Sequence, residues 1–337
     1  MRNQSSDRRN ALQTNRPDLV MIAVMGQIAH PVGAANPYRI GHDGVPRVLP
    51  ATGGIVLNQR VGDRCIGLMG DHIEPGVALH NNNREVIGGP RGSNLALLTY
   101  ACVGNRARVI SGPCTGKWGL VTGKHGGVDH VLVDFPPSVL QRLQIGDRIQ
   151  IYSYGLGLQL SNYPDIKITN CSPALLSRLG IRERKNAISS QQSFLEIPVT
   201  HEIPAKIMGS GIGKNTVWRG DYDIQLFDPE IRDRYRLGTL RFGDFVAIRG
   251  GDTRFGPSYR QNQVTIGIIV HGDSTVSGHG PGVVPLLTGS ATRLQPVIHS
   301  QANFAVLFNL RSLPETRTHQ PLVGRSQPNR SKAQMLV

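Results

Sequence analysis

The pattern of apolar and polar positions along the chain predicts many short strands separated by turns. The apolar runs Leu19–Met25 and Val264–Ile269 have the length and bounding residues of buried strands. One phrase recurs at 61–66, 145–151 and 242–248: an apolar residue, then Gly-Asp, then alternating apolar positions. Gly-Asp turns that lead into half-buried strands are typical of small barrels. We therefore expect a structural role for the aspartates of these turns, Asp63, Asp147 and Asp244.

Three short helices are predicted between the strands. Ser93 caps the first, which runs to Cys102, and the second follows a proline pair at 138–143. The third begins at Ser172 and ends at Gly180, with a serine cap, a proline in the first turn and a terminal glycine in the expected order. The chain is therefore predicted to be mostly β, with a few short helices and small barrels, arranged in two halves.

The boundary between the halves is expected in the least patterned polar stretch, 182–193. We predict an N-terminal β domain over residues 19–190 and a C-terminal β domain over residues 191–312. The flanking segments 1–18 and 313–337 are polar, basic and poor in aromatic residues. Such composition predicts disordered tails.

Composition and charge narrow the functional classes. The 40 glycines, 22 prolines and only 5% aromatic residues favour short strands and tight turns over a helical bundle. Of the net charge of +14, residues 1–18 carry +2 and residues 311–337 carry +4, so the body between them keeps +8. A mildly basic body suits an acidic ligand and does not require a dedicated DNA-binding groove. Nucleic acid is therefore not the favoured partner.

The cysteines and the hydropathy bear on the compartment. The four cysteines lie far apart and form no C-x-x-C pair, which argues against a zinc ribbon and against a secreted disulfide framework. No apolar run approaches a membrane-spanning length, and the N-terminus lacks the apolar region of a signal peptide. We expect a cytoplasmic protein without a membrane partner.

The segment Val270–Gly282 has the composition of a functional site. It follows a predicted buried strand and contains four glycines, two histidines, an aspartate and two serines. Glycines permit close backbone approach, and the polar side chains can then point into one small volume. Imidazole and carboxylate groups are ligands of Zn, Mn and Fe. His271, Asp273 and His279 are therefore predicted as ligands of a divalent metal or as catalytic acid–base groups.

Other polar clusters supply further candidates. Asp221 and Asp223 are added to the predicted metal ligands. The loop 209–213 lacks the spacing of a P-loop, but its Ser210 and Gly211 are predicted to bind substrate. His201 is a further catalytic candidate, and the remaining predicted substrate-binding residues are Arg254, Lys124 and His125. His72 and His130 each directly follow an aspartate in the sequence. We expect both to be hydrogen-bonded residues that fix a turn.

Residues 109–124 resemble the KOW motif of ribosomal proteins and transcription elongation factors. The match rests on Gly112, Gly116, Gly119, Val121 and Gly123. The resemblance implies a small SH3-like barrel at about 104–155, which in that group often contacts RNA or protein.

The body of the chain, from about Met21 to Asn309, resembles an uncharacterised prokaryotic family, domain-of-unknown-function family 4438. The phrases that carry the resemblance lie at 49–54, 71–77, 121–135, 208–213, 220–223 and 278–282. The resemblance implies no activity. The loop 271–282 is also similar to metal-dependent acetamidases and formamidases, although Thr275 and Pro281 stand where that pattern carries a histidine and an acid. This second resemblance implies a hydrolase.

Three functional hypotheses follow from the sequence. The leading one is a metal-dependent hydrolase of a small polar or anionic amide or ester, with Zn, Mn or Fe as cofactor. The second is a nucleic-acid-binding or ribosome-associated module that uses the KOW-like barrel. The third is a non-catalytic homo-oligomeric scaffold. The sequence leaves the substrate, the identity of the metal and the oligomeric state open.

Overall fold

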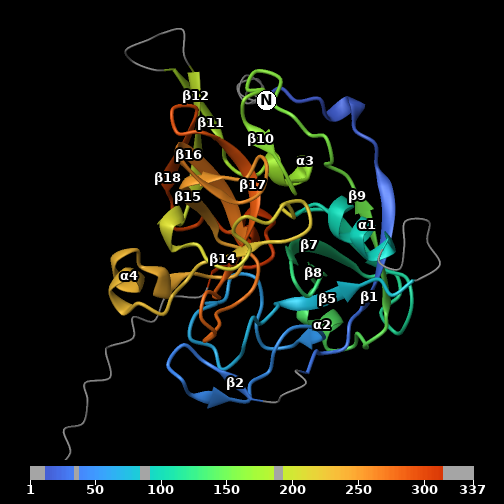
Figure 1. Ribbon diagram of the computed structural model, residues 1–337. Coiled ribbons are helices and arrows are strands. Elements are labelled where there is room, and N and C mark those ends of the chain that lie inside the picture. The colour runs from blue at the N-terminus through green and yellow to red at the C-terminus, as the bar shows by residue number, and fades with distance from the viewer. Residues whose placement is uncertain (1–11, 34–37, 84–91, 186–192, 314–337) are drawn as a thin grey trace, which may run out of the picture.

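The computed structural model describes residues 12–33, 38–83, 92–185 and 193–313 (Figure 1). The described residues form a mostly β protein with five short α-helices, as predicted. Figure 1 shows the N-terminal half and the C-terminal half side by side, with loops from both meeting near β14.

Six strands of the N-terminal half close into a barrel. In ring order they are β1 (Ile22–Ile28), β9 (Arg148–Ser153), β6 (Arg106–Val109), β7 (Trp118–His125), β8 (His130–Asp134) and β5 (Gly76–His80). The ring closes where Gln27 and Ile28 of β1 pair with His80 and Leu79 of β5. The predicted KOW-like segment 104–155 supplies only four of these strands, so the barrel extends beyond it. The short β4 (Ile55–Val56) pairs with β5, and β2 (Arg39–Ile40) pairs with β3 (Pro46–Arg47).

Alternating apolar residues explain the barrel interior. In β9, Ile149 and Ile151 are fully buried while Arg148 is exposed, as expected for a strand with one face toward the core. α1 (Gly92–Tyr100) packs Leu97 and Leu98 into the same core, and α2 (Pro137–Leu140) lies after β8.

Two further sheets combine the strands of the C-terminal half with β10 and β11, which precede the predicted boundary. The larger contains β10 (Lys167–Ile168), β17 (Gly282–Ser290), β16 (Ser258–Ile269), β15 (Phe245–Asp252) and β13 (His201–Pro204), with β14 (Tyr222–Asp223) paired to β17. The smaller contains β11 (Arg182–Lys185), β12 (Ser193–Val199) and β18 (Leu294–Ile298). The remaining helices are α3 (Pro173–Leu176), α4 (Pro229–Arg234) and α5 (Phe304–Leu307). Among the described residues, no helix has the length and apolar character needed to cross a membrane.

The predicted linker and the predicted N-terminal tail both contain paired backbone. Arg182–Lys185, at the start of the predicted linker, is strand β11 and pairs with β12, while the boundary placed after residue 190 lies outside the described residues. Within the predicted N-terminal tail, Thr14 forms a bridge with Leu160, and the Asn15 side chain donates to the carbonyl of Gly157 at 2.8 Å. Backbone pairing therefore orders part of the N-terminal segment for which composition alone predicted disorder.

The three Gly-Asp turns have the structural role that we predicted. The carboxylate of each aspartate accepts a hydrogen bond from the backbone N–H three residues earlier, at 2.8 Å for Asp63 and 2.9 Å for Asp147 and Asp244. The preceding glycines have φ between 81° and 99°, a conformation that glycine adopts without strain. The recurrent phrase therefore codes for one type of capped turn.

The two halves share a hydrophobic core. One cluster of buried side chains joins Ala78 and Leu132 of the barrel to Ile268 and Leu286 of the large sheet. The packing is close, because a Cβ on Gly123 of β7 would lie 2.3 Å from the Val270 side chain. The barrel and the large sheet are thus held together by one continuous core.

Candidate metal centre

Six histidine and aspartate side chains from both halves converge at the junction of the barrel and the large sheet. The barrel half contributes the loop before β5 and the end of β7. The other half contributes β14, the residue directly before it, and the loop between β16 and β17. The six are His72, His125, Asp221, Asp223, His271 and His279, and they form two groups of three.

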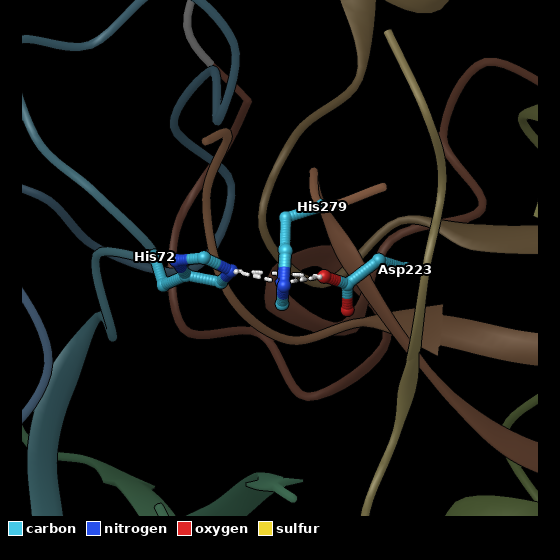
Figure 2. A group of neighbouring side chains, drawn as sticks. All are labelled: His72, Asp223 and His279. Carbon is cyan, nitrogen blue, oxygen red and sulfur yellow. Dashed lines mark hydrogen bonds and ion pairs between the residues drawn. The ribbon is translucent and has the colours of Figure 1, made fainter. Parts of the chain in front are cut away.

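The first group consists of His72, Asp223 and His279 (Figure 2). His279 Nδ1 lies 3.1 Å from His72 Nε2 and 3.0 Å from Asp223 Oδ2, and His72 Nε2 lies 3.6 Å from the same oxygen. Ligand atoms about 2.1 Å from one ion lie about 3.0 Å apart at octahedral angles and about 3.4 Å apart at tetrahedral angles. The three atoms therefore have the spacing of a metal-ligand set.

The second group consists of His125, Asp221 and His271. His271 Nε2 lies 2.7 Å from Asp221 Oδ2, yet the two atoms do not meet hydrogen-bond geometry, and neither has another hydrogen-bond partner. Both side chains are buried, and the rings of His125 and His271 stack with centroids 4.0 Å apart. Since buried polar atoms are nearly always paired, these two lack a partner that a cation would supply.

Hydrogen bonds fix the ring orientation of three of the histidines. In each, Nδ1 lies against an oxygen that can only accept: Asp71 Oδ1 for His72 (3.0 Å), Glu74 Oε1 for His125 (2.6 Å) and the Gly272 carbonyl for His271 (2.9 Å). Nδ1 of each neutral ring therefore carries the proton, and Nε2 keeps a free lone pair. Metal-ligating histidines are typically oriented in this way.

The charges of the site favour a cation at its centre. Burial alone would raise the pKa of Asp223, but the neighbouring imidazoles of His271, His279 and His72 lower it well below its usual range. Burial alone would lower the pKa of His271, but the carboxylates of Asp221 and Asp223 raise it well above its usual value. Burial and the neighbouring His271 lower the pKa of His125, which favours its neutral, ligating form.

Two buried carboxylates, those of Glu74 and Asp71, form hydrogen bonds to histidines of the centre and orient their rings. Glu74 accepts from His125, from His130 at 3.0 Å and from the backbone N–H of Gly53 at 2.6 Å. Burial alone would raise the pKa of Glu74, but its two histidine partners lower it below its usual range. Asp71 accepts from Ser274 Oγ at 2.7 Å and pairs with Arg39 at 2.7 Å. His72 itself has φ 56°, a costly conformation that functional sites tend to retain.

A pocket of about 240 Å³ opens over the first group. Five of the six residues line it, and only His271 lies behind the lining and is fully buried. The wall also carries two cationic side chains and two glycine-containing turns: Arg39, Lys214, Gly126–Gly127 and Ser210–Gly211. The pocket could hold a small anionic molecule beside the ligand atoms.

The structure brings most of the predicted site residues together. His271, His279, Asp221, Asp223 and His125 belong to the two groups, and Ser210 and Gly211 lie in the pocket wall. Asp273 is close to the site but outside both groups, because its carboxylate accepts from the backbone N–H groups of Gly67 at 3.4 Å and Ser274 at 2.8 Å. Its carbonyl accepts from the backbone of His72 and holds that loop in place.

Three other predicted residues do not line the pocket. Arg254 forms an ion pair with Asp252 at 2.7 Å. His201 is buried against the hydroxyls of Thr200 and Thr239, at 2.8 and 3.0 Å. Lys124 Nζ donates to Asn170 Oδ1 at 2.7 Å and to the Trp218 carbonyl at 2.8 Å, so it ties β7 to the segment that leads to Asp221.

Sequence reasoning missed several residues of the centre. We expected His72 to be only a turn residue, yet its Nε2 faces the first group while its Nδ1 is bonded to Asp71. His130 is hydrogen-bonded as expected, and its partner Glu74 is the missed support. Arg39 and Lys214 carried no distinguishing pattern. The run Asp-His-x-Glu at 71–74 was the available signal, because three ligand-type side chains in four residues seldom serve one turn.

Comparisons with known proteins identify relatives without a stated activity. The N-terminal and C-terminal models described as "Domain of unknown function (DUF4438)" match residues 38–177 and 185–308. The crystal structure of TM1086 is similar over 89% of this chain and 99% of that chain, with 40% identity and a TM-score of 0.80. No curated protein matches. The resemblances to the KOW motif and to acetamidases are not confirmed by these matches. The chain belongs to the family of the domain of unknown function DUF4438.

Proposed function

We propose that the protein is a metal-dependent hydrolase of a small anionic amide or ester. The proposal rests on the convergence of His72 Nε2, His279 Nδ1 and Asp223 Oδ2, with metal-ligand spacing, at the base of an open pocket. Two imidazoles and a carboxylate suit Zn, Mn or Fe, and three protein ligands leave coordination positions free for water and substrate.

Hydrolysis would add water to the carbonyl carbon and break its bond to nitrogen or oxygen, and a proton from the water would leave with the amine or alcohol. A divalent cation at this place supplies two effects: it polarises the carbonyl oxygen and lowers the pKa of a bound water. The chain holds the ligand atoms in place, because Asp71 fixes the His72 ring and Gly280 donates its backbone N–H to Asp223 at 3.4 Å. Orientation of this kind reduces the reorganisation needed during reaction.

The pocket wall favours an anionic substrate. Lys214 has no ion pair among the side chains of the described residues, although it lies in the wall. Arg39 also reaches the wall, but Asp71 already neutralises it. Lys214 is therefore the group that we assign to a carboxylate or phosphate of the substrate.

The exposed face of the barrel gives the nucleic-acid alternative little support. Trp118 is 39% exposed, and an exposed indole could stack on a base. However, the Arg106 guanidinium already lies 4.0 Å from the centre of that ring, where a base would have to stack. We therefore retain the hydrolase as the proposal.

Elemental analysis of the purified full-length chain tests the proposal. We expect near-stoichiometric Zn, Mn or Fe, which His279→Ala should lose and which His299→Ala, a change at an exposed histidine, should retain. The metal-loaded protein should then hydrolyse members of a panel of carboxylate-bearing amides and esters. A chain that binds none of these metals after reconstitution, or a metal-loaded chain inactive on the whole panel, would overturn the proposal.

A further inference from the structure

We infer that the centre binds two metal ions, with the Asp223 carboxylate as a bridge between them. The inference deepens the proposed function and rests on it for the role of the first ion. The second ion would be held by His125, Asp221 and His271, of which the first two line the pocket and only His271 lies behind the lining.

The orientation of Asp223 is that of a bridging carboxylate. Its Oδ2 lies 3.0 Å from His279 Nδ1 and 3.6 Å from His72 Nε2, whereas its Oδ1 lies 3.6 Å from His271 Nε2. Each oxygen thus faces one of the two groups. A carboxylate that offers one oxygen to each of two ions suits the separation of about 3.5–4 Å found in two-metal hydrolytic sites.

The second group contains the unsatisfied atoms that the second ion would satisfy. Asp221 Oδ2 and His271 Nε2 are buried without hydrogen-bond partners, and their side chains are 3% and 0% exposed. The other oxygen of Asp221 is already satisfied by the backbone N–H of Gly126 at 2.8 Å. Of the two carboxylate oxygens of Asp221, only Oδ2, which faces His271, has no hydrogen bond. Leaving such atoms unpaired is costly, and one cation would pair both.

The charge of the centre also suits bound cations. Asp221 and Asp223 place two carboxylates against four imidazoles, and no lysine or arginine pairs with either carboxylate among the described side chains. Buried carboxylates are normally paired or coordinate metals. Two divalent ions would leave the centre with a net positive charge, which would attract an anionic substrate into the pocket.

Gly282 provides the space for the second ion. A Cβ at this position would lie 1.8 Å from Asp221 Oδ2 and 2.3 Å from His271 Nε2, so any larger residue would occupy the gap between the two ligand atoms. Gly282 is the first residue of β17 and pairs with Asp223 of β14. The glycine therefore serves the space beside the ligands, since a strand position does not itself require one.

The two ions would differ in access. His125 and Asp221 line the pocket as the first group does, but the Asp221 and His271 side chains are only 3% and 0% exposed, whereas the His279 side chain is 36% exposed. A chelator should therefore remove the first ion faster than the second. The first ion would contact substrate, and the second would hold Asp223 and neutralise the buried carboxylates.

Metal stoichiometry of the full-length chain tests this inference separately from the proposed function. The chain is reconstituted with Mn²⁺ and analysed for Mn per chain and by electron paramagnetic resonance. We expect two ions that are magnetically coupled. Gly282→Ala and Asp221→Asn should each reduce the content to one uncoupled ion. Gly238→Ala is the matched control, because a Cβ there meets nothing within 4 Å, and it should keep both ions.

The possible outcomes distinguish failure of the second metal site from failure of the proposed function. A single ion in the unmodified chain would overturn the second site and leave the proposed function intact. No ion would overturn both. Two ions that persist in Gly282→Ala and in Asp221→Asn would overturn the assignment of the second site to this group. Circular dichroism of each variant shows that a loss of metal does not come from unfolding.

Discussion

Two sets of aspartates and histidines in this molecule differ in what their polar atoms face. In the structural set (Asp63, Asp147, Asp244 and His201), carboxylates accept backbone N–H groups and the imidazole bonds to threonine hydroxyls. In the metal centre, carboxylate oxygens and ring nitrogens face one another, and two of them have no hydrogen bond. Both sets consist of aspartates and histidines, and each contains buried and partly exposed members. The partners alone separate a structural polar group from a ligand.

Among the substitutions that test this comparison, we expect Asp223→Asn to have the largest effect. The amide keeps the volume of the carboxylate but loses its charge and one ligand oxygen, and Asp223 faces both groups of the centre. Changes behind metal ligands already cost about 10–100-fold, so we expect this change at a shared ligand to lower turnover at least about a thousand-fold and to remove bound metal. Metal analysis and activity assays measure both. Retention of full metal content would show that Asp223 belongs to the structural set.

His201 tests the structural set, because its protonation makes the stability of the folded chain depend on pH. Burial lowers the pKa of His201 to about 4, from an ordinary value of 6.5. The unfolded chain therefore binds a proton between pH 6.5 and pH 4 that the folded chain does not, and stability falls as the pH falls through this window. The shift corresponds to about 3 kcal/mol across the window.

The variant His201→Gln should remove this part of the acid sensitivity. Denaturant unfolding at pH 7 and at pH 4 measures the free-energy difference for both chains. We expect a smaller loss on acidification in the variant, together with unchanged metal content. Equal losses in the two chains, or a loss of metal, would place His201 outside the structural set.

The same comparison explains what the sequence could predict. The Gly-Asp phrase is local, since the aspartate and the N–H that it accepts lie three residues apart, and its role followed from the sequence. The loop 270–282 also stood out through its composition. The pairing of His72 with His279 joins positions that are 207 residues apart, and it depends on how the halves pack. No local pattern contains that information, and His72 was therefore assigned to a turn.

Asp147→Ala should affect stability but not the metal. Asp147 is 6% exposed and accepts the backbone N–H of Gln144 at 2.9 Å. Removing the acceptor leaves that donor without a partner, which costs about 1–3 kcal/mol. Denaturant unfolding measures the change, and metal analysis of the same preparation should show the content of the unmodified chain. A variant that loses metal without losing stability would contradict the separation of the two sets.

Lys214→Met should give the smallest effect, because Lys214 lies in the pocket wall and contacts neither group. Once a substrate is found, we expect its KM to rise about ten-fold, equivalent to about 1.4 kcal/mol, with kcat and metal content nearly unchanged. Added salt should weaken substrate binding to the unmodified chain more than to the variant, because the lost interaction is electrostatic. Lys206→Met, at an exposed lysine outside the pocket, is the matched control. An unchanged KM would show that the anion binds elsewhere. A fall in kcat would instead place Lys214 with the reacting groups of the metal centre.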